Sequence, residues 1–227
     1  MKYYLAPMEG LTTYNFRTNW NRCYGGMDKY FTPFISNRHM NSRERNDVLP
    51  EHNVGMYTVP QILTNKAEEF LSLAEQLAGY GYHEVNLNLG CPSGTVVARN
   101  RGAGFLGTPR ELEDFLDEIF EKCPLEISIK TRIGMDYMDE WAPLLKIYQK
   151  FPMKELIIHP RLQKEGYKGT PHLEAFAEAV ESLQCPLCYN GDITSPESLT
   201  QILTQLPSID TVMILSLIHI SEPTRPR

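Results

Sequence analysis

The strongest constraint on the fold is a regular alternation of two hydrophobic patterns along the chain. Eight short runs are rich in β-branched and apolar residues, which is typical of buried parallel strands. These predicted strands are Tyr3–Met8, Tyr30–Ile35, Met56–Leu63, Glu84–Leu89, Glu126–Thr131, Glu155–His159, Pro186–Asn190 and Thr211–Ile214. Most segments between them repeat apolar residues at the three- and four-residue spacing of one buried helix face, as in Ala67–Ala78. In a chain of 227 residues, this alternation predicts an α/β fold, a (β/α)₈ TIM barrel, rather than an open doubly wound sheet.

Three predicted helices also carry sequence signals at their first turn. Asn65 and Thr108 each precede a helical segment with a carboxylate three residues later, which is the pattern of a capping box. Pro109 adds proline at a first helical position, and Ser195-Pro196-Glu197 opens a third helix in the same manner. We therefore expect the side chains of Asn65, Thr108 and Ser195 to cap helices.

Composition excludes several other classes of protein. A hydrophobic fraction of 42% with 22% charged residues is that of a globular chain, not of a disordered, collagen-like or coiled-coil protein. The longest apolar run, Val212–Ile220, is far shorter than the roughly 20 residues that a membrane span needs. Five scattered cysteines do not suggest a secreted disulfide framework, and the spacing of Cys185 and Cys188 lacks the partners of a metal site. We expect a cytoplasmic protein with no membrane and no metal.

The charge balance limits how the chain could bind nucleic acid. A net charge of −6 gives no global attraction to phosphate backbones, so such contact requires a local basic face or another module. The best candidates for a basic rim around the pocket mouth are Arg99, Arg101, Arg110, Arg161, Lys164 and Lys168.

Polar and reactive side chains gather at the ends of the predicted strands. Active sites of TIM barrels lie at this end, in the loops between each strand and the next helix. The segments at these ends are Ala6–Gly10, Pro60-Gln61, Asn88–Pro92, Lys130–Arg132, His159–Arg161 and Asn190–Asp192. We expect them to meet around one pocket.

In this order, the segments resemble the tRNA-dihydrouridine synthases, flavin enzymes that reduce the C5=C6 bond of uridines in tRNA. The resemblance covers Tyr3 to Ile214, and its most specific pieces are Ala6–Gly10, Asn86–Pro92, Lys130–Arg132 and Tyr167–Gly169. It implies an FMN-binding barrel followed by a smaller helical domain that helps to hold tRNA. It also implies NADPH as the electron donor, an expectation that rests on the resemblance alone, because the chain contains no dinucleotide-binding fingerprint.

The resemblance assigns a cofactor role to nine residues. Lys130 would face the pyrimidine part of the flavin, where an ammonium stabilises the negative charge that two-electron reduction leaves near N1 and O2. Gln61 would bond to the ring, and His159 would contact the ribityl and phosphate end. The complete set is Pro7, Met8, Glu9, Gln61, Lys130, His159, Asn190, Gly191 and Asp192.

Cys91 is the predicted catalytic residue. Hydride delivery to C6 of uracil makes C5 basic, and a thiol with an ordinary pKa near 8.5 is protonated at neutral pH, so it can donate the missing proton. The residues that the resemblance places near the substrate are Asn88, Arg132, Arg161, Tyr167 and Lys168.

The chain departs from the family pattern after Ile214. The family continues with a Gly-Arg-Gly-type turn that grips the FMN phosphate, whereas Leu215–Arg225 reads as the translation of a common sequencing adapter. We therefore expect residues 1–214 to form an incomplete FMN-binding barrel, truncated after the eighth strand, and residues 215–227 to be a non-native tail without the helical domain. We also expect a weakened last barrel interface and reduced FMN affinity, because a phosphate dianion would lose donors.

Two other functions remain open from the sequence. One is an FMN barrel acting on a free pyrimidine such as dihydroorotate, against which Cys91 and Tyr167–Gly169 argue. The other is an RNA-binding barrel whose flavin site has decayed, which the intact Cys91, Lys130 and Gln61 oppose. The motifs indicate neither the oligomeric state nor which tRNA uridine would be modified.

Overall fold

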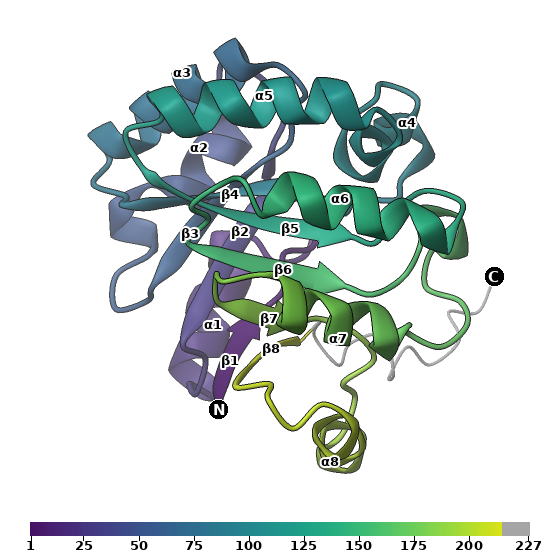
Figure 1. The fold of residues 1–227 in the computed structure, drawn as a ribbon. Coiled ribbons are helices and arrows are strands. Elements are labelled where there is room, and N and C mark those ends of the chain that lie inside the picture. Colours follow the sequence, from purple (N-terminus) through teal and green to yellow (C-terminus); the bar gives the residue numbers. More distant parts are fainter. Residues whose placement is uncertain (215–227) are drawn as a thin grey trace, which may run out of the picture.

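The computed structural model describes residues 1–214, which form a closed barrel of eight parallel strands (Figure 1). Each strand pairs with the next one in the sequence, and β8 pairs with β1 to close the barrel. The strands are β1 (Lys2–Leu5), β2 (Lys29–Ile35), β3 (Thr58–Ile62), β4 (Glu84–Leu89), β5 (Glu126–Arg132), β6 (Glu155–His159), β7 (Leu187–Tyr189) and β8 (Thr211–Ile214). Each overlaps a predicted run, so the predicted TIM barrel is confirmed. The segment predicted to be a non-native tail, residues 215–227, lies outside the described residues.

Helices follow each strand from β1 to β7 and cover the outside of the barrel. Figure 1 shows α5, α6 and α7 packed one beside the next over the strands. Within residues 1–214, no helix is long and apolar enough to cross a membrane. The α-helices are α1 (Tyr14–Cys23), α2 (Ser42–Val48), α3 (Ala67–Gly79), α4 (Gly94–Val97), α5 (Pro109–Lys122), α6 (Trp141–Tyr148), α7 (Leu173–Ser182) and α8 (Pro196–Gln205). Short 3₁₀ helices are η1 (Pro50–His52), η2 (Gly102–Gly107), η3 (Met138–Glu140) and η4 (Gln163–Glu165).

Apolar side chains form two layers, one between the strands and the helices and a smaller one inside the barrel. The outer layer includes Phe70, Leu116, Trp141 and Leu156, all almost completely buried. The inner layer consists of Tyr4, Ala6, Phe31, Val59, Ile157, Cys188 and Met213. Because side chains fill the interior, a ligand has room only at the ends of the barrel.

The seam that closes the barrel is formed by β1 and β8. These strands pair at four register positions, from Lys2 opposite Thr211 to Leu5 opposite Ile214. The N–H of Ala6 also donates to the carbonyl oxygen of Ile214 at 2.9 Å. This interface is therefore paired along both strands, whereas β7 and β8 share a single register pair, and the expected weakening stays a prediction.

A buried ionic cluster closes the opposite, N-terminal end of the barrel, which we call the floor. Lys29, the first residue of β2, has its Nζ 3.2 Å from carboxylate oxygens of both Glu84 and Glu155. The hydroxyl of Tyr4 donates to Glu155 at 2.7 Å, and that of Tyr57 donates to Glu84 at 3.0 Å. Each charge at the floor therefore has partners, as buried charges require.

The helix caps agree only partly with their prediction. Ser195 Oγ accepts the N–H of Ser198 at 3.2 Å and caps α8, as predicted. The predictions for Asn65 and Thr108 are wrong, because neither side chain caps a helix. The N-cap residue of α3 is Lys66, whose N–H donates to Thr64 Oγ1 at 3.2 Å, while Thr108 Oγ1 accepts a bond from Asn100 at 3.0 Å.

Candidate active site

A cavity of about 340 Å³ lies at the C-terminal ends of the strands, which we call the mouth of the barrel. Strand ends and loops from β1 to β6 contribute its walls. It is lined by Pro7, Met8, Glu9, Phe34, Gln61, Asn88, Gly90, Cys91, Pro92, Ser93, Lys130, Arg132, His159 and Tyr167. The cavity thus brings together the predicted site residues except Asn190, Gly191, Asp192, Arg161 and Lys168.

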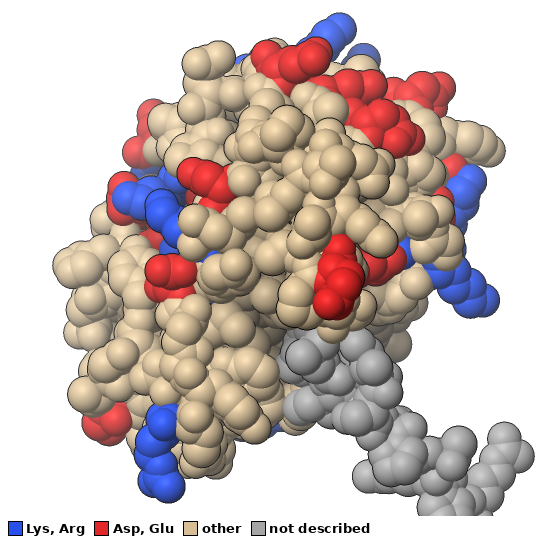
Figure 2. All heavy atoms as spheres, turned by 90° about the horizontal axis from the view of Figure 1, so that it is seen from below, with Lys and Arg blue, Asp and Glu red and all other residues tan. Residues whose placement is uncertain are grey.

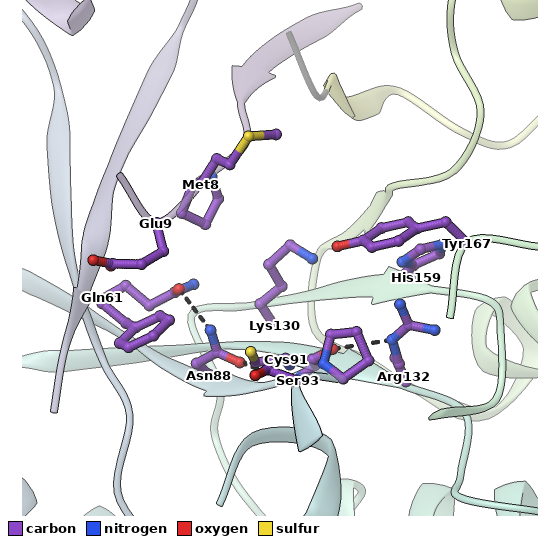
Figure 3. A pocket seen from close by; sticks show the side chains of 14 residues that line it. Met8, Glu9, Gln61, Asn88, Cys91, Ser93, Lys130, Arg132, His159 and Tyr167 are labelled. Atoms are coloured by element: carbon purple, nitrogen blue, oxygen red, sulfur yellow. Dashed lines mark hydrogen bonds between the residues drawn. The ribbon is translucent and has the colours of Figure 1, made fainter. Parts of the chain in front are cut away.

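The cavity has walls of different chemistry (Figure 3). Cys91 and Asn88 lie on one wall, and Met8 lies opposite them. Lys130 extends between these walls, with His159 and Tyr167 beside the end of its side chain. The arrangement places a thiol, an ammonium and an imidazole around one space.

The loop that carries Cys91 is held by backbone contacts on two sides. Asn88 Oδ1 accepts the N–H groups of Gly90 at 3.0 Å and Cys91 at 2.9 Å. The N–H of Ala103 donates to the carbonyl oxygen of Cys91 at 3.1 Å. Gly102 permits this contact, because its φ is +56° and an added Cβ would lie 2.9 Å from the Cys91 oxygen. The position of the thiol is therefore set by β4 and by the η2 segment together.

Lys130 is a partly buried cation without a counterion among residues 1–214. The structure gives its Nζ neither a hydrogen bond nor an ion pair within this part of the chain, and it lies in the cavity wall. Burial lowers its pKa to about 8, and the positive charge of Arg132 also lowers it. An ammonium in this state can donate to a ligand that supplies an acceptor or a negative charge.

His159 presents a neutral ring to the cavity. Arg161 Nη1 lies 3.1 Å from His159 Nε2, and a guanidinium has no acceptor, so Nε2 must accept this hydrogen bond. Burial, followed by the charges of Lys130, Arg132 and Arg161, holds the pKa of His159 well below its ordinary value of 6.5. The neutral ring therefore carries its proton on Nδ1.

Arg161 connects the loop after β6 to the turn after β7. Its guanidinium binds the carboxylate of Asp192 through two bonds, at 2.8 and 2.5 Å. It also donates to the carbonyl oxygens of Lys168 at 3.1 Å and Gly169 at 2.5 Å, and the residue is 1% exposed. The predicted substrate residue Arg161 thus lies behind the cavity wall and braces it.

Arg132 and Tyr167 form the wall beside His159. The Nε of Arg132 donates to the carbonyl oxygen of Gly90 at 3.0 Å, and its guanidinium carbon lies 5.4 Å from the Tyr167 ring centroid. Tyr167 is 67% exposed and lies at the entrance. Arg132 therefore couples the Cys91 loop to the edge of the cavity.

The predicted phosphate turn, Asn190–Asp192, lies outside the cavity wall. Asn190 Nδ2 donates to the carbonyl oxygen of Met213 in β8 at 2.9 Å. Asp192 has a φ of 44°, and an added Cβ at Gly191 would lie 2.9 Å from the hydroxyl oxygen of Tyr189. The turn is therefore built against β7 and β8, and its role in binding a phosphate stays a prediction.

Sequence reasoning missed Phe34, which is the penultimate residue of β2 and lines the cavity. The strand-end rule that selected the other segments also applies to β2, so this signal was present. The register between β2 and β3 shifts between Phe31 and Phe34, and Pro33 in this stretch lacks a backbone donor. Gly90, Pro92 and Ser93 belong to the same loop as Cys91 and complete the lining.

The predicted basic rim is only partly available to a ligand. Arg101 binds Glu69 at 3.0 Å, and Arg161 binds Asp192. Figure 2 views the molecule from below, and the described residues visible there carry scattered charges of both signs without a continuous basic patch. In the part of the chain that the structure describes, no cluster of three or more His, Cys, Asp or Glu residues could hold a metal ion.

The fold and the cavity define a (β/α)₈ barrel with one polar site at the mouth. Solved structures share this fold at low sequence identity. Histamine dehydrogenase from Rhizobium sp. 4-9 aligns with 94% of the chain and 43% of its own length, with a TM-score of 0.65 and 10% identity. Morphinone reductase aligns with 93% of the chain and 81% of its own length, with a TM-score of 0.62 and 11% identity.

The sequence matches the dihydrouridine synthase family over residues 4–216, and the chain belongs to that family. A probable tRNA-dihydrouridine synthase of Staphylococcus aureus (strain COL) is 32% identical over 226 residues, which include 92% of this chain and 66% of the relative. A tRNA-dihydrouridine synthase B of Pasteurella multocida is 25% identical and covers 93% of this chain and 64% of the relative. The chain thus spans about two thirds of the length of these relatives.

Proposed function

We propose that residues 1–214 form the catalytic barrel of a cytoplasmic tRNA-dihydrouridine synthase that uses FMN and NADPH to reduce the C5=C6 bond of uridine in tRNA. One observation carries the proposal: Cys91, Lys130 and Gln61 line one cavity in a chain of the dihydrouridine synthase family. The names of the relatives from S. aureus and P. multocida agree with it.

The side chains of the cavity fit a flavin ring. Met8 and Phe34 offer apolar surface to the faces of a planar ring, and Gln61 and Lys130 offer donors to its pyrimidine edge. Lys130 suits this position because it has no competing counterion among the described residues. For the ribityl and phosphate end we propose His159 and the turn Asn190–Asp192, in which backbone groups would have to make the contacts.

The proposed reaction adds a hydride and a proton across one double bond. FMN, if bound and reduced by NADPH, would supply the hydride to C6 of the uracil ring. Cys91 donates its thiol proton to C5, so the S–H bond breaks, a C–H bond forms, and solvent returns a proton to the thiolate. Asn88 and Arg132 would hold the base through its carbonyl oxygens, with Tyr167 and Lys168 at the entrance.

The test is to purify the chain, record its flavin absorbance, and measure dihydrouridine in tRNA by mass spectrometry after incubation with NADPH. Matched reactions contain uridine, uracil or dihydroorotate in place of tRNA. Dihydrouridine in tRNA alone supports the proposal. Turnover of a free pyrimidine alone would identify a small-molecule oxidoreductase, and tRNA binding without flavin would identify an RNA-binding barrel.

Substitution of Cys91 tests the proton donor. Cys91→Ala should lower dihydrouridine formation by about 10²- to 10⁴-fold, the usual contribution of a general acid, and leave bound flavin unchanged. Ser93→Ala is the matched control, because Ser93 lines the same cavity from the same loop. Normal turnover by Cys91→Ala would exclude the thiol as the acid.

A further inference from the structure

Two polar residues inside the barrel, Asn86 on β4 and Ser128 on β5, have no role in the reaction proposed above. Both side chains are 0% exposed, and neither lines the cavity. Apolar branched residues usually fill such positions in a TIM barrel, and a buried amide is costly unless it is hydrogen-bonded. Their presence therefore calls for a physical reason.

These residues belong to a chain of hydrogen bonds that begins at the Cys91 loop. The N–H groups of Gly90 and Cys91 donate to Asn88 Oδ1, and Asn88 Nδ2 donates to Gln61 Oε1 at 2.8 Å. Gln61 Nε2 then donates to Asn86 Oδ1 at 2.8 Å. Figure 3 shows the hydrogen bond between Asn88 and Gln61, which both line the cavity.

From Asn86 the chain of hydrogen bonds continues away from the mouth of the barrel. Asn86 Nδ2 donates to Ser128 Oγ at 2.9 Å, and Ser128 Oγ lies 3.4 Å from the carbonyl oxygen of Val85, its acceptor. Both ends are backbone groups whose polarity cannot change, because an N–H only donates and a carbonyl only accepts. Each amide between them must therefore point its oxygen toward the loop and its nitrogen toward the floor of the barrel.

We propose that Asn86 and Ser128 are positioning residues that fix the orientation of the Gln61 and Asn88 amides. This orientation decides what the cavity offers to a ligand. Each of the two amides uses one N–H within the chain and keeps a second N–H, while Asn88 Oδ1 accepts two bonds and Gln61 Oε1 accepts one. Together with Lys130 and the Nδ1–H of His159, they make the cavity rich in donors, so it suits a planar ring whose edge carries carbonyl and imine acceptors.

The inference deepens the proposed flavin site and rests on it for the identity of the ligand. Asn86→Leu removes the acceptor of Gln61 and cuts the chain, whereas Asn86→Asp keeps an acceptor at the same place. Ser128→Ala removes the last side-chain acceptor with a minimal change in volume. Ile157→Val is the matched control, because Ile157 is also buried inside the barrel and lies outside the chain of bonds.

FMN titration followed by flavin fluorescence provides one measurement. We expect Asn86→Leu to bind FMN about tenfold more weakly, a change equivalent to about 1.4 kcal/mol. We expect Ser128→Ala to bind it a few-fold more weakly and Asn86→Asp to recover most of the affinity. Equal affinity of wild type, Asn86→Leu and Ser128→Ala would overturn the positioning role.

Side-chain amide NMR of the ligand-free protein provides the second measurement and does not depend on flavin. The NH₂ signals of Gln61 and Asn88 should exchange slowly with solvent in the wild type and in Ile157→Val, and faster in Ser128→Ala. Unchanged exchange in Ser128→Ala would overturn the inference. If the wild type fails to bind FMN while the amide signals respond as expected, the flavin proposal fails and the positioning role stands.

Discussion

The floor and the mouth of the barrel each contain a buried lysine, and the two lysines have opposite surroundings. At the floor, Lys29 lies between the carboxylates of Glu84 and Glu155. At the mouth, Lys130 has no counterion among residues 1–214, and the charge that lowers its pKa is that of another cation, Arg132. The comparison shows that one end of the barrel is built for stability and the other tolerates an electrostatic cost that a ligand could relieve.

The largest expected effect is at the floor. Lys29→Met leaves two carboxylates close together and without their cation, so we expect it to lower the free energy of unfolding by about 3–5 kcal/mol. Urea denaturation measures this loss. A change below about 1 kcal/mol would show that the floor cluster does not stabilise the barrel.

The same substitution at the mouth should act in a different way. Lys130→Met removes a cation that is not paired within residues 1–214, so we expect unchanged or higher stability. We expect FMN affinity to fall by about tenfold, or about 1.4 kcal/mol, because the ring loses a charged donor. Urea denaturation and FMN titration of the same preparation measure both effects. Destabilisation of the size expected for Lys29→Met would remove the distinction between the two ends.

The pH dependence should sharpen this distinction. The pKa of Lys130 is about 8 in the folded protein and 10.5 in an exposed lysine. Between these values the unfolded chain binds the extra proton, so the contribution of this residue to stability increases as pH rises from about 8 to about 10.5. As pH rises through the folded value of about 8, FMN affinity should decrease, by about fivefold, because the ammonium loses its charge. Titrations at pH 7 and pH 9.5 should show this decrease in the wild type and not in Lys130→Met.

The smallest expected effect concerns a single bond at the floor. Tyr57→Phe removes the hydroxyl that donates to Glu84, and the residue is 51% exposed, so water can replace the lost partner. We expect a loss of about 0.5 kcal/mol in the free energy of unfolding and no change in FMN affinity. A loss as large as that of Lys29→Met would mean that the hydroxyl, not the ammonium, holds the cluster together.

Sequence patterns predicted the fold well, because the apolar runs that favour strands locally are the same residues that the closed barrel buries. The runs Glu84–Leu89, Glu155–His159 and Thr211–Ile214 coincide with the strands β4, β6 and β8. Helix caps were harder to predict, because a suitable side chain can lie at the wrong position or bind another partner. The N-cap of α3 is Lys66, one position after Asn65, and the Thr108 hydroxyl accepts a bond from Asn100.

The sequence predicted where the cavity lies and part of the residues that line it. Residues at strand ends reach the mouth whatever the details of packing, which is why Cys91, Lys130 and His159 line one cavity. Arg161 has the same kind of sequence position, yet its guanidinium binds Asp192 and two carbonyl oxygens behind the wall. A strand-end rule cannot separate such residues, because the distinction depends on which partners the next loop supplies.

The sequence by itself determined the order of the strands and helices, the barrel that follows from it, and the end of the barrel at which polar side chains gather. Hydrophobic period and strand ends are local properties, so they can be read from neighbouring residues. Only the tertiary structure decided which lysine is paired and which partners the buried amides bind. Those outcomes depend on partners from other strands, such as Asn86 with Gln61 and Ser128, which lie 25 and 42 positions away in the chain.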